Sequence, residues 1–476
     1  MNNKLSKDNA IVFSTQILVY MKGLFLMPII IKTLGVSTYG TFILISTFVG
    51  ILGGLSSLGV GTKSFRYLPS AKSEYDKAQI FYPPFYFKLF ILIFISIIIV
   101  IFEKRIKLFF IHDDLTFSIY ILPLYLLFYL IYEYSHNYLR YTSRIFYMSL
   151  LDFGYAYLHV FFILFYSNKI GLININILFL SQSFVALFVA IPVLFLIFKE
   201  INFNFIFFKL NEIKEEIKIG LPIVLNLVVD YILATSDRFI LAYFMGAIAV
   251  GLYVPAYTLG ALILLVPKAI GTVVPQLMSK SVDNDDFLEA KKIFLHSIKI
   301  FMILTIPFIF GIYLIGYDIL ILLANDEVAD NGKYIATIIA ISSFFYGFNI
   351  LMSQANMVDL KTVVIFKANF LAGIFNLIST FIGFYFIHSI YVPAITTVLS
   401  FMIATIYFYK TIESKWLDNS IFFLFIKVLM ISILMFIFVN ISMVFLPELS
   451  MVMSIIIKIL LALIIYFPLV ILLKIL

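Results

Sequence analysis

The sequence predicts an all-α integral membrane protein, a polytopic bundle of about fourteen transmembrane helices. Hydrophobic residues make up 63% of the 476 positions and charged residues only 12%, and the mean hydropathy is +1.10. A water-soluble chain carries about 25% charged residues, so this chain has too little polar surface to cover itself in water. Its apolar runs are continuous and about 20 residues long, the length of a helix that crosses the membrane, whereas a membrane barrel alternates apolar and polar residues.

Apolar windows define the expected helices in order along the chain. The first run is longer than a signal-peptide core and lacks a cleavage pattern, so we interpret it as a retained helix. Every connection is short, which leaves no room for a soluble domain between helices. The absence of cysteine excludes disulfides, thiolate metal sites and cysteine catalysis. The windows cover residues 10–31, 39–61, 80–102, 117–138, 145–166, 172–198, 219–243, 250–275, 296–317, 334–355, 364–386, 389–409, 421–445 and 450–472.

Basic residues indicate the orientation of these helices. The N-terminus, the even-numbered connections and the C-terminus hold 20 of the 33 lysines and arginines, whereas the odd-numbered connections hold six. Positive charge favours the cytoplasmic side, so both termini are predicted to be cytoplasmic. The net charge of +7 therefore follows from topology, and no long basic segment suggests a nucleic-acid partner.

An internal repeat divides the chain. The segments LGVSTYGTF (residues 34–42) and MGAIAVGLY (residues 245–253) share two glycines at the same spacing and are offset by 211 residues. The same offset carries the end of the sixth predicted helix onto the end of the twelfth. We therefore predict two pseudo-symmetric six-helix lobes, residues 1–210 and 211–415, followed by an additional helix pair in residues 416–476. Two lobes of six helices point the same way and favour a substrate site between them.

Charges near the middle of predicted helices mark candidate transport residues. Lys22 lies about twelve residues into the first helix, and Asp230 lies about eleven residues into the seventh. At 1.5 Å per residue both lie roughly 17 Å deep, too far for a lysine to reach water along its own length. Two interpretations stay open: a functional charge facing the interior, and a structural Lys22–Asp230 ion pair.

Other charges in the second half are further candidates. Asp237 is seven residues after Asp230, on the same helix face, and Arg238 lies beside it, where either a transport role or a local structural pair fits. Lys268 lies between Pro267 and Gly271, where we expect a kinked or locally open helix. Both interior function and escape of its ammonium to water remain open for Lys268.

The first half of the chain holds possible cavity-lining residues. Asp152 and His159 are seven residues apart on the fifth predicted helix and are possible cavity-lining residues. Three further lysines, Lys88, Lys427 and Lys458, lie within about two turns of a helix end, so we expect their side chains to reach the interface. No metal-ligand pattern and no catalytic constellation stands out, and we predict that the protein is not an enzyme.

Two segments resemble a known family. The segment YMKGLFLMPIIIKTLGVSTYGTFILISTFVGILGGLSSLGVGTKSFRYL (residues 20–68) is similar to the opening of the Wzx-like polysaccharide flippases, and SDRFILAYFMGAIAVGLYVPAYTL (residues 236–259) is similar to the start of their second half. These flippases belong to the multidrug/oligosaccharidyl-lipid/polysaccharide (MOP) exporter superfamily, with the lipid II flippases and the MATE drug antiporters. Many Wzx-like members have twelve helices, and the extra pair here is similar to that of the lipid II flippases.

The resemblance implies a function. Such proteins move an undecaprenyl-pyrophosphate-linked oligosaccharide, such as an O-antigen or capsule repeat unit, across the bacterial inner membrane by alternating access. The implied partners are this substrate, membrane lipids, a polysaccharide polymerase and a chain-length regulator. The resemblance implies no cofactor, but it leaves open coupling to H⁺ or Na⁺. Lys22 and Lys268, with Arg66 near the cytoplasmic mouth, would neutralise the pyrophosphate, and Asp230 or Asp237 would compete for those charges or bind a coupling cation.

Three alternatives are weighed against this interpretation. A lipid II or teichoic-type precursor flippase would use the same chemistry. A MATE-like drug antiporter would suit organic cations and carry an acidic residue in its first helix, where Lys22 stands. A membrane-embedded polysaccharide polymerase or glycosyltransferase would need a substantial outer loop to hold its acceptor, and the predicted outer connections are short.

Overall fold

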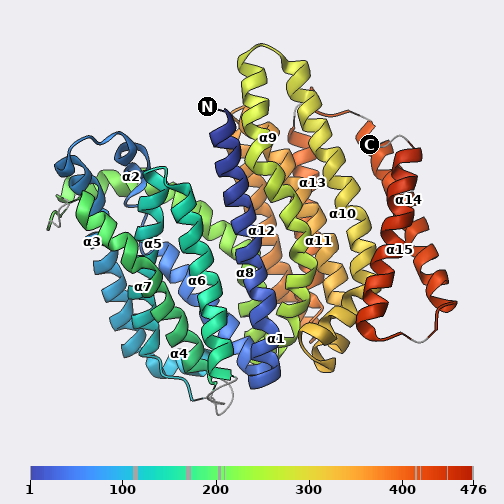
Figure 1. Ribbon diagram of the computed structural model, residues 1–476, viewed down its shortest axis with the longest axis horizontal. Helices are drawn as coiled ribbons and strands as arrows, with labels where there is room; N and C mark the ends of the chain where they lie inside the picture. Colours follow the sequence, from blue (N-terminus) through green and yellow to red (C-terminus); the bar gives the residue numbers. More distant parts are fainter. Residues whose placement is uncertain are drawn as a thin grey trace. The chain divides into compact units, whose positions relative to one another are not determined.

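The computed structural model describes residues 2–110, 116–167, 173–201, 205–207, 209–412, 415–418, 420–447 and 449–473, and within these it leaves out the side chains of 2–10, 65, 210, 226, 230 and 272. All regular structure in these residues is helical (Figure 1). The chain forms two compact units: Met1–Thr235 with Gly246–Ile248, and Ser236–Met245 with Ala249–Leu476. The predicted lobe boundaries follow the internal repeat and stay predictions.

Unit 1 contains the helices before the middle of the chain. Within it α5 packs against α7 and α3, and α6 packs against α1 and α7. The α8 helix begins in this unit and continues into unit 2. The helices are α1 (Asn2–Leu55), α2 (Thr62–Tyr67), α3 (Glu74–Ile101), α4 (Glu103–Phe110), α5 (Ile121–Tyr141), α6 (Ile145–Phe165), α7 (Ile175–Glu200) and α8 (Leu210–Gly260), with a 3₁₀ turn at Leu68–Ser70.

Unit 2 is built around α10 and α11, which pack against each other and against α9. On one side α11 contacts α13, which pairs with α12, and α14 and α15 pack against α10 (Figure 1). The helices are α9 (Leu265–Asp283), α10 (Phe287–Leu323), α11 (Asp326–Val358), α12 (Thr362–Phe386), α13 (Val392–Thr411), α14 (Ser420–Val444) and α15 (Met451–Leu472), with a 3₁₀ turn at Ala261–Leu264 before α9.

Each of the fourteen predicted crossings coincides with a helical segment. Eleven helical stretches of the described chain are long and apolar enough to cross a membrane, and two of them, Ile11–Leu55 and Tyr231–Asp283, are 45 and 53 residues long. Each long stretch contains a glycine with non-helical backbone angles, which divides it into two segments. The α5 helix is not among these stretches but, at 21 residues, is of crossing length. The prediction of a polytopic all-α bundle is confirmed.

The two interrupting glycines reproduce the predicted repeat in the backbone. Gly35 has φ 85° and ψ 170°, and Gly246 has φ 78° and ψ 178°. They are 211 residues apart, the offset found in the sequence. A positive φ of this kind is accessible to glycine at little cost and is strained for other residues. The same bend therefore follows the first helical segment of each repeat because the same residue type occupies it.

Local sequence determines where several helices begin. At five helix starts a side-chain oxygen accepts the backbone N–H of the residue three positions later, which satisfies one of the amides left unpaired in the first turn. These capping residues are Ser73, Asn174, Asp286, Asn325 and Ser450.

Ion pairs connect helices inside each unit. Lys88 of α3 is 3% exposed and lies 2.7 Å from Glu133 of α5. Lys458 of α15 lies 2.8 Å from Asp318 of α10. The prediction that Lys88 reaches the interface is wrong, because its side chain is buried against a carboxylate on a neighbouring helix. Removing Glu133 would leave this buried charge uncompensated, which costs about 3–5 kcal/mol. Lys458 and Asp318 are 18% and 21% exposed, and the prediction for Lys458 stays a prediction.

Candidate functional site

Lys22 lies on α1 against an aromatic wall in unit 1. Its side chain is partly exposed, and its Nζ lies 4.8 Å from the centre of the Tyr155 ring on α6. An ammonium over an aromatic face gains roughly 0.5–2 kcal/mol, more when water is excluded. Lys22 is therefore held in the apolar part of the bundle by the face of a ring.

Three described carboxylates of unit 1 have other partners. Glu133 pairs with Lys88, Asp152 contacts His136, and Glu200 pairs with Arg144. The side chain of Asp230 lies outside the described residues, so the predicted Lys22–Asp230 pair stays a prediction. Among the described carboxylates, none forms an ion pair with Lys22, and its positive charge is available to an anion.

A polar network surrounds the Tyr155 hydroxyl. The Gln182 side chain on α7 donates from Nε2 to the hydroxyls of Tyr155, at 3.0 Å, and of Tyr125 on α5, at 3.2 Å. The two hydroxyls lie 3.4 Å apart. The Gln182 Oε1 atom is buried without a hydrogen-bond partner among the described residues. An unsatisfied buried amide oxygen costs about 1–3 kcal/mol, which marks this network as a place where a polar ligand group would be stabilised.

The sequence analysis missed this network. Tyr125, Tyr129 and Tyr132 are spaced four and three residues apart, so they share one face of α5. That face meets Tyr155, whose ring centre lies 4.5 Å from that of Tyr132. The spacing of the tyrosines was the available signal, but tyrosine is so frequent in this chain that the pattern did not stand out.

The two possible cavity-lining residues of this unit, Asp152 and His159, occupy different environments. Asp152 accepts a 2.7 Å hydrogen bond from the Tyr132 hydroxyl, and its other oxygen lies 3.3 Å from His136 Nε2. His159 is completely buried, and its Nε2 lies 3.3 Å from the Leu178 carbonyl of α7. Asp152 thus belongs to a half-exposed polar cluster, whereas His159 lies within the packing between α6 and α7. Cavity-lining roles for both stay predictions.

Asp237 and Arg238 form the corresponding polar centre of unit 2. Asp237 is 4% exposed; it accepts the hydroxyl of Tyr253 at 2.9 Å and the backbone N–H of Arg238 at 2.8 Å. The Arg238 guanidinium lies 5.5 Å from the centre of the Tyr257 ring. The carboxylate is therefore fixed by hydrogen bonds inside α8, and the guanidinium is stacked on an aromatic residue one helical turn beyond Tyr253.

Lys268 follows an irregular stretch of helix, as expected, but the irregularity comes earlier than predicted. The 3₁₀ turn Ala261–Leu264 precedes Pro267. A proline lacks the N–H that would bond to the carbonyl four residues back, here Ile263, and its ring crowds that carbonyl. The turn before Pro267 therefore tightens, and Lys268 is exposed in the first turn of α9. Arg66 of α2 is also exposed and lies over the Tyr67 ring at 5.6 Å.

A close contact in unit 1 joins the turn after α1 to α8. A Cβ atom added to Gly220 would lie 2.0 Å from the Gly59 carbonyl oxygen, so the two backbones touch. Beside them the Gly61 N–H donates to Glu216 at 3.2 Å, and Lys63 lies 3.7 Å from the same carboxylate. Glu216 is 4% exposed. These residues lie at the end of the bundle predicted to face the cytoplasm.

A polytopic helical bundle with ionisable groups inside its crossing segments has the construction of a membrane transporter. Comparisons with known proteins agree. The sequence matches the family described as "Polysaccharide biosynthesis protein" over residues 5–282 and the family described as "MatE" over residues 222–382. Because the first match covers more than half of the chain, this protein belongs to the polysaccharide biosynthesis protein family, within the MOP superfamily. No protein with a curated description matches the sequence.

Solved structures share the fold. A lipid II flippase MurJ in an inward-closed conformation is 19% identical, covers 98% of this chain and 100% of its own, and superimposes with a TM-score of 0.72. An inward-facing MATE family multidrug resistance transporter of the MOP superfamily is 12% identical, with 83% and 96% coverage and a TM-score of 0.66. A variant of a Vibrio cholerae MATE transporter is 14% identical, with 88% and 99% coverage and a TM-score of 0.56.

Proposed function

We propose that this protein translocates an undecaprenyl-pyrophosphate-linked oligosaccharide repeat unit, of the O-antigen or capsule type, across the bacterial cytoplasmic membrane by alternating access. The observation that carries the proposal is membership of the polysaccharide biosynthesis protein family over residues 5–282. Such a substrate combines a lipid tail, a diphosphate and a sugar headgroup. The protein must therefore offer positive charge and hydrogen-bonding groups inside an apolar bundle. A transporter of free, uncharged sugars would not need the positive charge.

The residues around Lys22 suit the diphosphate and the first sugar. Lys22 supplies a positive charge over the Tyr155 ring, and Gln182 has an amide oxygen free to accept a sugar hydroxyl. Aromatic faces and amide groups are also suited to sugar rings, whose C–H faces are apolar and whose edges are polar. In this proposal Lys22 binds substrate, Lys268 and Arg66 attract it toward the mouth, and Asp230, Asp237 and Arg238 change partners between states.

A second candidate substrate is lipid II or another cell-wall precursor on the same carrier lipid. The observation that favours it is the match to MurJ over the full length of both chains, which includes the helix pair α14 and α15. Both candidates have the same carrier and diphosphate, and they differ only in the sugars. The site around Lys22 is therefore common to both.

Depletion of the protein in its host tests the function and separates the two substrates. We expect the carrier-linked precursor to accumulate in the inner leaflet while its synthesis continues. Accumulation of an oligosaccharide repeat unit with loss of surface polysaccharide supports the first proposal, and accumulation of lipid II with lysis supports the second. If no lipid-linked precursor accumulates, both are wrong. Loss of polymer with precursor already in the outer leaflet would instead indicate a polymerase.

The proposed direction of transport requires cytoplasmic termini, which single cysteines test. The chain has no native cysteine, so each introduced thiol is the sole target. Thr33 and Ser73 are both exposed and lie near opposite ends of predicted crossings. In intact cells we expect an impermeant thiol reagent to label Thr33→Cys and to leave Ser73→Cys unlabelled until the membrane is opened. Labelling of Ser73→Cys alone would reverse the orientation.

A further inference from the structure

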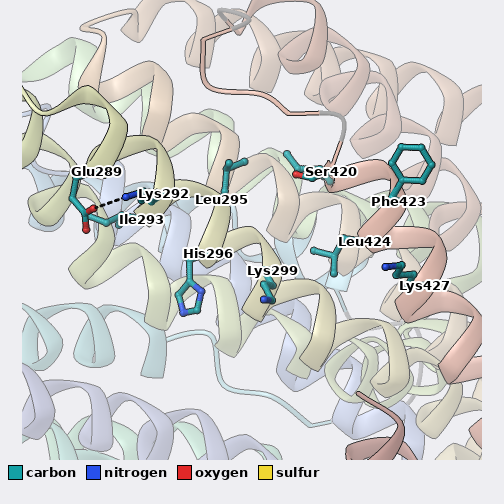
Figure 2. Close-up of a pocket in the computed structure, with 11 residues that line it drawn as sticks. Glu289, Lys292, Ile293, Leu295, His296, Lys299, Ser420, Phe423, Leu424 and Lys427 are labelled. Atoms are coloured by element: carbon teal, nitrogen blue, oxygen red, sulfur yellow. Dashed lines mark ion pairs between the residues drawn. The ribbon is translucent and has the colours of Figure 1, made fainter. Parts of the chain in front are cut away.

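A basic groove lies between the N-terminal parts of α10 and α14 in unit 2. It encloses about 770 Å³, and its walls include Lys292, His296 and Lys299 of α10 and Lys427 of α14 (Figure 2). The three α10 residues are spaced four and three positions apart, which places them on one helix face. In Figure 2 the Lys427 ammonium points from α14 toward the side of the groove where Lys299 lies.

The charges of this groove are poorly compensated. Three lysines face it, against one acidic residue, Glu289. Glu289 lies 3.8 Å from Lys292, and the two side chains are 51% and 77% exposed, so this pair is weak. Within the part of the chain that the structure describes, Lys299 and Lys427 form no ion pair. Like charges on facing helices repel each other, and an anion placed between them would hold α14 against α10.

The groove also has apolar lining residues and borders a second chamber that is rich in aromatic residues. Leu424 and Ile421 of α14 form its floor. Ile421 and Phe423 also line a neighbouring chamber of about 1120 Å³ between α10, α11, α13 and α14, whose walls include six phenylalanines together with Lys291 and Asp418. The two spaces therefore share lining residues of α14; the groove is basic, and the chamber is rich in aromatic residues. A ligand that occupies both must have an anionic head and a hydrocarbon chain.

The groove lies near one end of α10, at the depth expected for lipid head groups. The α10 helix has 37 residues and is about 55 Å long, so it extends beyond a hydrocarbon core of about 30 Å. Lys292, His296 and Lys299 lie in its N-terminal third, and Lys427 lies seven residues after the start of α14. Basic pockets between crossing helices at this level bind the head groups of anionic lipids.

We propose that this groove binds the phosphate group of an anionic glycerophospholipid, with an acyl chain in the aromatic chamber. The Lys299 and Lys427 ammonium groups donate to the phosphate oxygens from two helices, and Lys292 and His296 contribute at the rim. The lipid thereby connects α14, and with it α15, to α10. This site takes a lipid of the surrounding membrane and is independent of the transported substrate.

Trp416 provides a local reporter for the test. It is the only tryptophan in the sequence, and its ring centre lies 4.7 Å from that of Phe287 and 5.7 Å from that of Phe294, both on α10. The next residue, Leu417, lines the aromatic chamber. Brominated acyl chains quench indole fluorescence on close approach, so binding in this chamber is read directly from the purified full chain in detergent.

We expect brominated phosphatidylglycerol to quench Trp416 at much lower concentration than brominated phosphatidylcholine. The Lys299→Gln/Lys427→Gln variant should lose about 25-fold in affinity for phosphatidylglycerol, about fivefold for each lysine, and keep its weak binding of phosphatidylcholine. The matched control is Lys280→Gln/Lys410→Gln, which removes two exposed lysines at other helix ends of unit 2 and should bind like the parent protein.

The following outcomes would overturn the proposal. The first is equal quenching by the two lipids, and the second is an equal loss of affinity in the control variant. The third is full affinity in a Lys299→Gln/Lys427→Gln protein that elutes at the native volume. The fourth is displacement of the brominated lipid by inorganic phosphate alone. Displacement by undecaprenyl diphosphate at lower concentration than by unlabelled phosphatidylglycerol would assign the groove to the carrier lipid instead.

Discussion

Replacing Lys22 by alanine should strongly reduce transport while the protein remains in the membrane at normal levels. A charge-assisted hydrogen bond contributes about 1.5–3 kcal/mol, so losing it from the bound diphosphate lowers transport by about 10- to 150-fold. Lys22→Arg keeps the positive charge over the Tyr155 ring and should retain partial transport. The measurement is transfer of the lipid-linked precursor in proteoliposomes, normalised to the amount of protein.

Two comparisons make the Lys22 result specific. Lys32→Ala removes an exposed lysine from the same helix and should transport normally. If Lys22 is instead paired structurally with Asp230, each single alanine variant loses protein from the membrane, because a buried charge is left uncompensated. The exchange Lys22→Asp/Asp230→Lys would then restore both abundance and transport. Normal transport by Lys22→Ala at normal abundance would contradict both interpretations.

Gly220→Ala should open the contact between α8 and the turn after α1. The new Cβ would lie 2.0 Å from the Gly59 oxygen and 2.4 Å from its carbonyl carbon. Neither atom belongs to a side chain that can rotate away, so the two backbones must separate. Overpacking typically costs about 1–3 kcal/mol, which lowers the population of the closed contact by about 5- to 150-fold. The equivalent change at Gly59 adds backbone strain, because its φ is +82°.

Disulfide formation measures this contact. Lys63 and Glu215 lie 3.4 Å apart and are 33% and 73% exposed. Replacing both with cysteine removes this weak pair and the 3.7 Å contact of Lys63 with Glu216, equally in every protein compared. We expect rapid cross-linking in the parent sequence and slow cross-linking with Gly220→Ala. The control is Gly53→Ala, because no atom lies within 4 Å of its new Cβ. Equally rapid cross-linking in all three proteins would show that the backbones do not meet. Under the proposed function, Gly220→Ala should also impair transport, since this contact closes the predicted cytoplasmic end.

The sequence by itself determined the class, the crossings and the repeat. In a membrane every backbone polar group must be satisfied within the segment, so an apolar run of sufficient length has to be helical. That local constraint explains why the predicted windows coincide with helices without any knowledge of packing. The recurrence of the Gly35 bend at Gly246 is also local, because a residue without a Cβ permits a positive φ at that position with little strain.

Only the tertiary structure decided which side chains meet. Residue spacing along a helix defines a face but not the neighbouring helix that covers it. Lys88 was therefore expected to reach the interface, although Glu133, 45 residues away, fixes it inside the bundle. Likewise Tyr155 could not be placed beside Lys22, nor Gln182 beside Tyr155, because these contacts require α1, α5, α6 and α7 to converge. A crossing segment forms through contacts within itself, whereas a site forms through contacts between segments that are far apart in the sequence.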